Sequence, residues 1–232
     1  MVDGMTFKES LENEKMKWAV MNRAQKWDYF KAYYMLPTII VVAVLTLVVS
    51  YIFTYIRNSR DTVAGIYFLN VVADQSFYDK VEGEYFDYVG ANEKDYMTDV
   101  STENLLELTE SGYDSTAYAT DMQVVAMLTA ASLDFMFLDD TTLERYSNYG
   151  CYANLEELLT EEEYEALAPY IVEVTDEDGN TTPAAICLTG TELQEKYSIY
   201  SCYGENPYLV VLVNGKNYEN ALTFIDYLFF EE

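Results

Sequence analysis

The sequence predicts an α/β protein: a single-pass N-terminal transmembrane helix followed by one α/β sandwich with a mainly parallel sheet. Three observations support this prediction. A run of 25 residues near the N-terminus holds no charged side chain, positive and negative charges fall on opposite sides of that run, and strand-like and helix-like segments alternate after it. Strands that alternate with helices are typical of parallel sheets covered by helices.

The uncharged run spans residues 32–56 and reads AYYMLPTIIVVAVLTLVVSYIFTYI. At about 1.5 Å per residue a helix of this length reaches about 37 Å, more than the roughly 30 Å hydrocarbon core of a bilayer. Tyrosines near both ends suit the membrane interface. We therefore expect a lead-in over 1–31, a lipid-embedded helix over 32–56, a linker over 57–64 and a folded domain over 65–232.

The charge distribution predicts the orientation of the span. Residues 1–60 hold eight Lys/Arg and five Asp/Glu, whereas residues 61–232 hold five Lys/Arg and 35 Asp/Glu. Basic residues concentrate on the cytoplasmic side of a span, so the N-terminus is expected in the cytoplasm and the acidic domain outside the cell membrane. A small-residue cleavage site is not evident, which favours an uncleaved signal anchor. So acidic a surface repels phosphate backbones, and nucleic acid is not an expected partner.

Periodicity and turn residues predict the elements of the outer domain. Four strands, a β-hairpin and six helices are expected in an order that alternates along most of the domain. The strands are 65–72, 96–101, 133–138 and 208–213, the hairpin is 171–188, and the helices are 76–90, 102–112, 118–132, 142–149, 161–168 and 217–230. Capping boxes are predicted at Thr141 with Glu144 and at Thr160 with Glu163, and Thr191 with Gln194 is expected to cap a further short helix.

The composition excludes several kinds of catalysis. The chain has no histidine, so Ser-His-Asp and Cys-His catalysis and histidine-ligated zinc are ruled out. Paired carboxylates can hydrolyse glycosides, but a chain with 40 acidic residues supplies such pairs by chance. The segment TDEDGNTT, from Thr175, resembles part of a calcium loop but lacks the later glutamate. We expect no enzyme activity, no cofactor and no metal site.

Two features of the outer domain leave alternatives open. Asp139 and Asp140 follow a strand whose end is a usual ligand crevice in open α/β sheets, yet acids there also stabilise the start of a helix. Cys187 and Cys202 are fifteen residues apart and can pair in a disulfide outside the cell, whereas three reduced thiols are the alternative.

Several segments together resemble the extracellular solute-binding proteins of the sugar-binding type. They are LDFMFLDD from Leu133, the glycine at 150, ANLEELL from Ala153 and YLVVLVNGKNYENALTFIDYLF from Tyr208. Only about 38 residues separate Pro169 from Pro207, where that family carries a second lobe. The resemblance therefore implies one lobe, with a crevice lined by Asn70, Asp139, Asp140 and Thr141.

The resemblance implies a non-enzymatic, membrane-anchored domain of the bacterial envelope, accessory to transport or sensing. The acidic surface favours a neutral or cationic small ligand. The alternative is a protein-interaction module without a small ligand, which docks onto a transporter or another envelope protein. An apolar patch on an outer face would favour docking.

Overall fold

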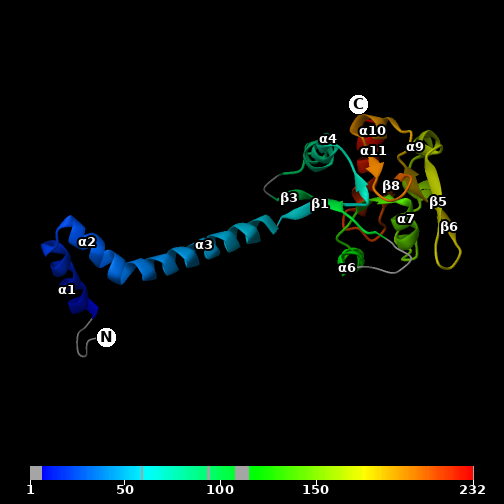
Figure 1. Cartoon of the computed structure of the whole chain (residues 1–232). Coiled ribbons are helices and arrows are strands. Elements are labelled where there is room, and N and C mark those ends of the chain that lie inside the picture. Colours follow the sequence, from blue (N-terminus) through cyan, green and yellow to red (C-terminus); the bar gives the residue numbers. More distant parts are fainter. Residues whose placement is uncertain (1–6, 59, 93–94, 108–114, 232) are drawn as a thin grey trace. The chain divides into compact units, whose positions relative to one another are not determined.

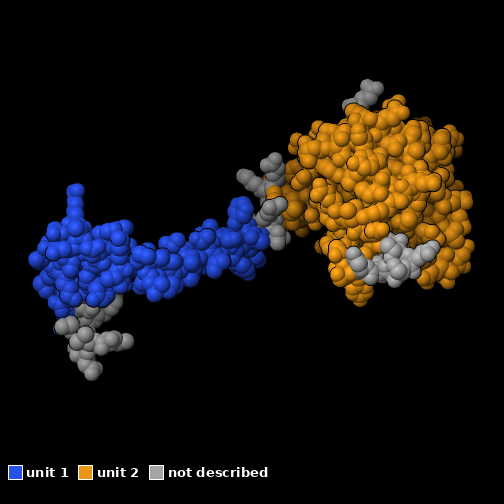
Figure 2. All heavy atoms as spheres, in the orientation of Figure 1, with its two compact units in different colours: residues 1–59 blue, residues 60–232 orange. Residues whose placement is uncertain are grey.

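The computed structural model describes residues 7–58, 60–92, 95–107 and 115–231. Its contacts divide the chain into two compact units, residues 1–59 and residues 60–232 (Figure 2). Among the described residues, the regular elements of the first unit are all helices, and the strands all lie in the second unit (Figure 1).

The N-terminal unit consists of a helical lead-in and one long helix. The lead-in comprises α1 (Phe7–Val20), α2 (Arg23–Tyr29) and the π-helical turn η1 (Phe30–Tyr34), and α3 runs over Met35–Asn58. Glu14 of α1 accepts hydrogen bonds from the hydroxyls of Tyr29 (2.9 Å) and Tyr34 (3.0 Å), which ties α1 to the start of the long helix. The widened turn η1 precedes Pro37, whose ring would clash with a carbonyl of the preceding turn in a regular α-helix.

The long helix has the length and composition of a membrane span. It is continuous from Arg23 to Tyr55 and contains an 18-residue stretch with a mean hydropathy of 2.5, none of which is buried within the described chain. The expected span of residues 32–56 lies almost entirely within it. The helix ends at Asn58 and the first strand begins at Asp61, so most residues of the linker expected over 57–64 belong to the helix or to the strand.

The second unit is built on one six-stranded sheet of mixed direction, with the order β3-β1-β4-β8-β6-β5. Strands β3, β1 and β4 are parallel, whereas β8, β6 and β5 pair antiparallel. The expected α/β class is confirmed, but the parallel arrangement covers only half of the sheet, because β8 lies antiparallel beside β4. The strands are β1 (Asp61–Leu69), β3 (Tyr96–Asn104), β4 (Phe135–Asp139), β5 (Ile171–Thr175), β6 (Thr181–Cys187) and β8 (Pro207–Val211), with β2 (Val71–Val72) and β7 (Tyr200–Ser201) paired separately.

Helices cover both faces of the sheet and create two cores. Successive residues of a strand point to opposite faces, so Ile66 and Phe68 join one core while Tyr67 and Leu69 join the other. The second core lies under α6 (Ser115–Thr129) and α7 (Asp140–Ser147). The first core lies under α4 (Gln75–Asp79), η2 (Lys80–Glu84), α5 (Tyr85–Tyr88), α8 (Leu155–Leu158), α9 (Glu161–Leu167), α10 (Glu192–Tyr197), η3 (Tyr218–Asn220) and α11 (Ala221–Phe229).

Stacked aromatic rings hold the first core together. Phe68 of β1 stacks on Phe137 of β4 with ring centroids 4.3 Å apart, and Phe77 of α4 meets Phe137 edge-on at 5.6 Å. Phe135 stacks on Phe224 of α11 at 4.0 Å. Each fully buried ring contributes about 1.5–3 kcal/mol through burial alone. These contacts fix α4 and α11 on the same face of the sheet.

One predicted helix is replaced by a strand in its described part. Strand β3 continues to Asn104, and residues 105–107 have no regular structure, so the helix expected over 102–112 is wrong as far as residue 107. Residues 108–112 lie outside the described residues. Asn104 explains the extension, because its side chain donates to the Phe68 carbonyl (3.0 Å) and its own carbonyl accepts from the Asn70 N–H (2.9 Å).

Candidate functional site

The four side chains predicted to line a crevice lie together at the carboxyl ends of β1 and β4. Asn70 follows β1 with a left-handed backbone, φ +58°, and its side chain is fully buried. Its amide donates to Asp139 Oδ2 (3.2 Å) and to the Leu106 carbonyl (2.9 Å), and its Oδ1 accepts from the Leu106 N–H (2.7 Å). Every polar atom of this side chain is bonded to the chain itself.

Asp139 is the N-cap of α7. Its Oδ1 accepts from the Thr142 N–H (2.9 Å), the Thr142 hydroxyl (2.6 Å) and the hydroxyl of the exposed Thr141 (2.9 Å). In return, the Thr142 hydroxyl oxygen accepts a hydrogen bond from the Asp139 N–H, and the two bonds together form a capping box. The box expected at Thr141 and Glu144 is therefore wrong by two residues. The helix-starting interpretation of the acidic pair holds for Asp139.

Asp140 holds a segment that we call the strap, residues 202–208. Its Oδ2 accepts from the N–H groups of Glu205 (2.6 Å) and Asn206 (2.9 Å), and its Oδ1 accepts from the Tyr208 hydroxyl (2.8 Å) and the Asn206 amide (3.3 Å). Burial opposes ionisation of Asp140, but these hydrogen bonds outweigh it and lower the pKa of the carboxyl. Close by, Gly204 donates its N–H to Asp139 Oδ2 (3.1 Å).

The strap lies where the ligand crevice was expected. A Cβ at Gly204 would meet Asp140 Oδ2 at 2.5 Å and Asp139 Cβ at 3.1 Å, so the backbone packs directly on the acidic pair. Gly204, Asn206 and Tyr208 were not predicted from the sequence to lie at this site. The Gly-Glu-Asn-Pro run from residue 204 indicates a turn. Local sequence, however, gives no sign that a turn 65 residues downstream meets Asp140.

The three cysteines are free thiols, and the acidic hairpin turn is held by hydrogen bonds within the turn. Cys187 is half-buried, Cys202 is exposed, and both are free thiols, so the expected disulfide is not formed in this structure; Cys151 is also a free thiol. Burial and the Asp139 carboxylate raise the pKa of Cys202. Asp176 accepts from the N–H and the side-chain amide of Asn180 (2.8 and 2.9 Å), as a polar turn predicts. The described residues contain no group of three or more metal-ligating side chains.

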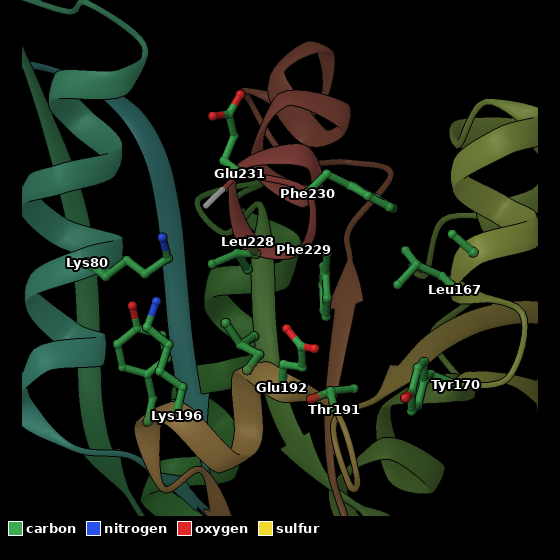
Figure 3. A pocket seen from close by; sticks show the side chains of 13 residues that line it. Lys80, Leu167, Tyr170, Thr191, Glu192, Lys196, Leu228, Phe229, Phe230 and Glu231 are labelled. Atoms are coloured by element: carbon green, nitrogen blue, oxygen red, sulfur yellow. The ribbon is translucent and has the colours of Figure 1, made fainter.

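A pocket of about 650 Å³ opens on the face of the sheet covered by α9, α10 and α11 (Figure 3). Apolar side chains of α9, α10 and α11 share its wall with polar ones, four of which are charged: Lys80, Glu192, Lys196 and Glu231. The lining residues are Lys80, Ala166, Leu167, Tyr170, Thr191, Glu192, Leu193, Lys196, Tyr197, Leu228, Phe229, Phe230 and Glu231. No local motif marked this pocket, because its wall is assembled from helices up to about 150 residues apart in the chain.

Local capping positions the elements that form the pocket. Thr160 caps α9 through a box with Glu163, as predicted from the sequence. Thr191 accepts from the Gln194 N–H (3.2 Å) to start α10, and the Gln194 side chain accepts from the Gly190 N–H (2.8 Å). These caps fix where α10 begins and so place Glu192 at the pocket wall.

Comparison with protein-family models, curated proteins and solved structures finds no match to this chain. Function is therefore inferred from the chemistry of the chain and from the pocket.

Proposed function

We propose that this chain is a membrane-anchored, non-enzymatic binding protein of the bacterial envelope. The helix over 35–58 anchors the chain in the bilayer with its N-terminus in the cytoplasm, and the acidic α/β domain is displayed outside the cell. The domain binds a small solute as an accessory of transport or sensing, like one lobe of a solute-binding protein.

The pocket between α9, α10 and α11 is the observation that carries the proposal. Its volume of about 650 Å³ falls within the range of about 300–1,000 Å³ typical of small-molecule sites. Its wall combines apolar side chains with charged groups that can orient a ligand. The absence of histidine from the whole sequence supports a binding role over the commonest forms of nucleophilic catalysis.

Solute binding is tested by thermal unfolding of the full chain in nanodiscs with a panel of sugars, amino acids, polyamines and carboxylates. Circular dichroism follows unfolding, because both tryptophans lie in the N-terminal unit and do not report on the domain. A ligand that binds only the folded state at 100 times its Kd stabilises it by about 2.7 kcal/mol. An unchanged melting temperature with every compound would contradict the proposal.

The orientation is tested with the native thiol of Cys202, which is exposed while Cys151 is buried. A membrane-impermeant maleimide is expected to label Cys202 in intact cells at pH 8, and Cys202→Ser is expected to lose most of that label. Labelling that requires lysed cells would place the domain in the cytoplasm. Cys202→Ser keeps the Cys202 N–H that donates to the Asn70 carbonyl (2.7 Å), so the fold is preserved.

A second candidate is a protein-docking module, and the strap is the observation that favours it. The strap closes the crevice at Asp139 and Asp140, and the neighbouring Tyr200 and Tyr203 remain 57% and 47% exposed. A photo-cross-linker at Tyr203 that captures an envelope protein, with none captured from the exposed Lys216, would support docking. Equal cross-linking at both positions would reject it.

A further inference from the structure

Two of the few cations in the acidic domain meet at the pocket. Residues 61–232 contain only five Lys/Arg among 35 acidic residues, yet both Lys80 of η2 and Lys196 of α10 line the pocket. Figure 3 shows their side chains on the same side of it. Burial lowers the pKa of Lys80, the charge of Glu84 raises it, the positive charge of Lys196 lowers it and Glu231 raises it, so Lys196 and both carboxylates act on this ammonium group. A cation pair of this kind favours an anion between or beside its members.

Aromatic rings, rather than carboxylates, hold these ammonium groups. Lys80 Nζ lies 3.9 Å from the ring centroid of Tyr227, and Lys196 Nζ lies 5.3 Å from that of Tyr197. Within the described part of the chain, neither lysine forms a salt bridge. The nearby Glu84 and Glu231 instead accept from the hydroxyls of Tyr227 (3.4 Å) and Tyr88 (3.2 Å). A ring face orients an ammonium group without forming an ion pair with it, so each lysine can still donate to a ligand carboxylate, in competition with Glu84 and Glu231 at Lys80.

One part of the remaining wall is apolar. Leu167 and Tyr170 lie across the pocket from the lysines, with Phe229 between the two sides (Figure 3). Glu192 and Glu231 also line the pocket, so the two lysines leave it close to neutral overall. A single negative charge therefore fits the pocket better than a doubly charged phosphate. An occupant with a charged end and an apolar end matches both sides of the wall.

We infer that this pocket binds a small amphipathic monocarboxylate, with its carboxylate at Lys80 and Lys196 and its apolar body against Leu167 and Phe229. The inference rests on the proposed solute-binding function and names the class of its ligand. It departs from the neutral or cationic ligand expected from the net charge. At physiological ionic strength the field of exposed charges is screened over about 8 Å. The contacts that a ligand makes inside the pocket therefore decide selectivity more than the net charge of the domain does.

The test is calorimetric titration of the full chain in nanodiscs with 3-phenylpropionate. The comparison compounds are acetate, which lacks the apolar body, 2-phenylethylamine, which reverses the charge, and inorganic phosphate. Binding of 3-phenylpropionate alone is expected. Tighter binding of the amine or of phosphate than of the carboxylate would overturn the inference.

Matched variants locate the site. Lys80→Met and Lys196→Met keep the length of the apolar stem and remove one charge, as does the control Lys216→Met, which is exposed and outside the pocket. Loss of one charge-assisted hydrogen bond is expected to weaken 3-phenylpropionate binding about ten- to hundredfold in either pocket variant and less than twofold in the control. Equal weakening in all three, or none in the pocket variants, would overturn the inference.

The two proposals fail in different ways. If sugars or polyamines from the panel raise the melting temperature while 3-phenylpropionate does not bind, the binding function stands and the carboxylate inference is wrong. If no compound of either set binds, both are wrong.

Discussion

The structure predicts that Asp140→Ala destabilises the domain, because Asp140 holds the strap through four hydrogen bonds. The substitution removes the acceptor and leaves its donors without a partner. Glu205 is exposed, so water can satisfy its N–H. Tyr208 is only 8% exposed, so its hydroxyl is enclosed, and Asn206 is half-buried.

The magnitude follows from these two donors. A donor left unsatisfied in a buried site costs about 1–3 kcal/mol, so the buried Tyr208 hydroxyl at about 1–3 kcal/mol and the half-buried Asn206 N–H at about 1 kcal/mol predict a loss of about 2–4 kcal/mol. If Asp140 served only as an exposed ligand residue, its removal would instead leave stability unchanged or raise it. A chain of net charge −27 gains from losing a negative charge.

Urea unfolding of the full chain in nanodiscs, followed by circular dichroism, measures the effect. With a slope of about 2 kcal/mol/M, the predicted loss lowers the midpoint by about 1–2 M. The matched control is Glu177→Ala, which removes the same charge from an exposed position in the β5–β6 turn. A midpoint for Asp140→Ala equal to that of the control would refute the structural role of Asp140.

Two further perturbations follow from the same contacts. Gly204→Ala places a Cβ 2.5 Å from Asp140 Oδ2 and 3.1 Å from Asp139 Cβ, so its melting temperature is expected to fall by an amount matching about 1–3 kcal/mol; no change would show that the strap can shift freely. Asp226 has a pKa raised to about 6 by its hydrogen bond with Glu163 and by burial, so the folded state holds this proton more tightly than the unfolded state, and stability falls as pH rises from about 4 through 6. Melting curves at pH 5 and 7.5 should therefore differ less in Asp226→Asn than in the wild type, whereas an exposed control, Asp178→Asn, should keep the wild-type difference; identical pH responses in the two variants would reject the pairing.

Short-range patterns account for most of the elements that the sequence predicted correctly. The Thr160 and Glu163 box, the hairpin around Asp178 and the amphipathic helix at the C-terminus depend on residues a few positions apart, and all three form. The predictions for the end of β3 and for the cap of α7 failed, because contacts with residues distant in the sequence decide both. The extension of β3 depends on the contact of Asn104 with the end of β1, and the cap of α7 moved to Asp139, which also bonds to Asn70 and Gly204.

The candidate site divides in the same way. The sequence placed Asn70, Asp139, Asp140 and Thr141 at one sheet edge, because carboxyl ends of neighbouring parallel strands meet there, and the structure brings them together. It did not indicate that the strap would bond to the acidic pair. It also did not indicate the pocket, because Lys80 and Lys196 are 116 residues apart and converge only through packing on one face of the sheet.

The sequence by itself determined the apolar helix, the separation of charge along the chain, the absence of histidine chemistry and the α/β class. Each of these depends on composition or on residues that are neighbours in the chain. Only the tertiary structure decided the mixed direction of the sheet, the strap over Asp139 and Asp140, and the pairing of two lysines beside an apolar wall. These depend on contacts between segments tens of residues apart, whose energies are set by which surfaces fold against each other.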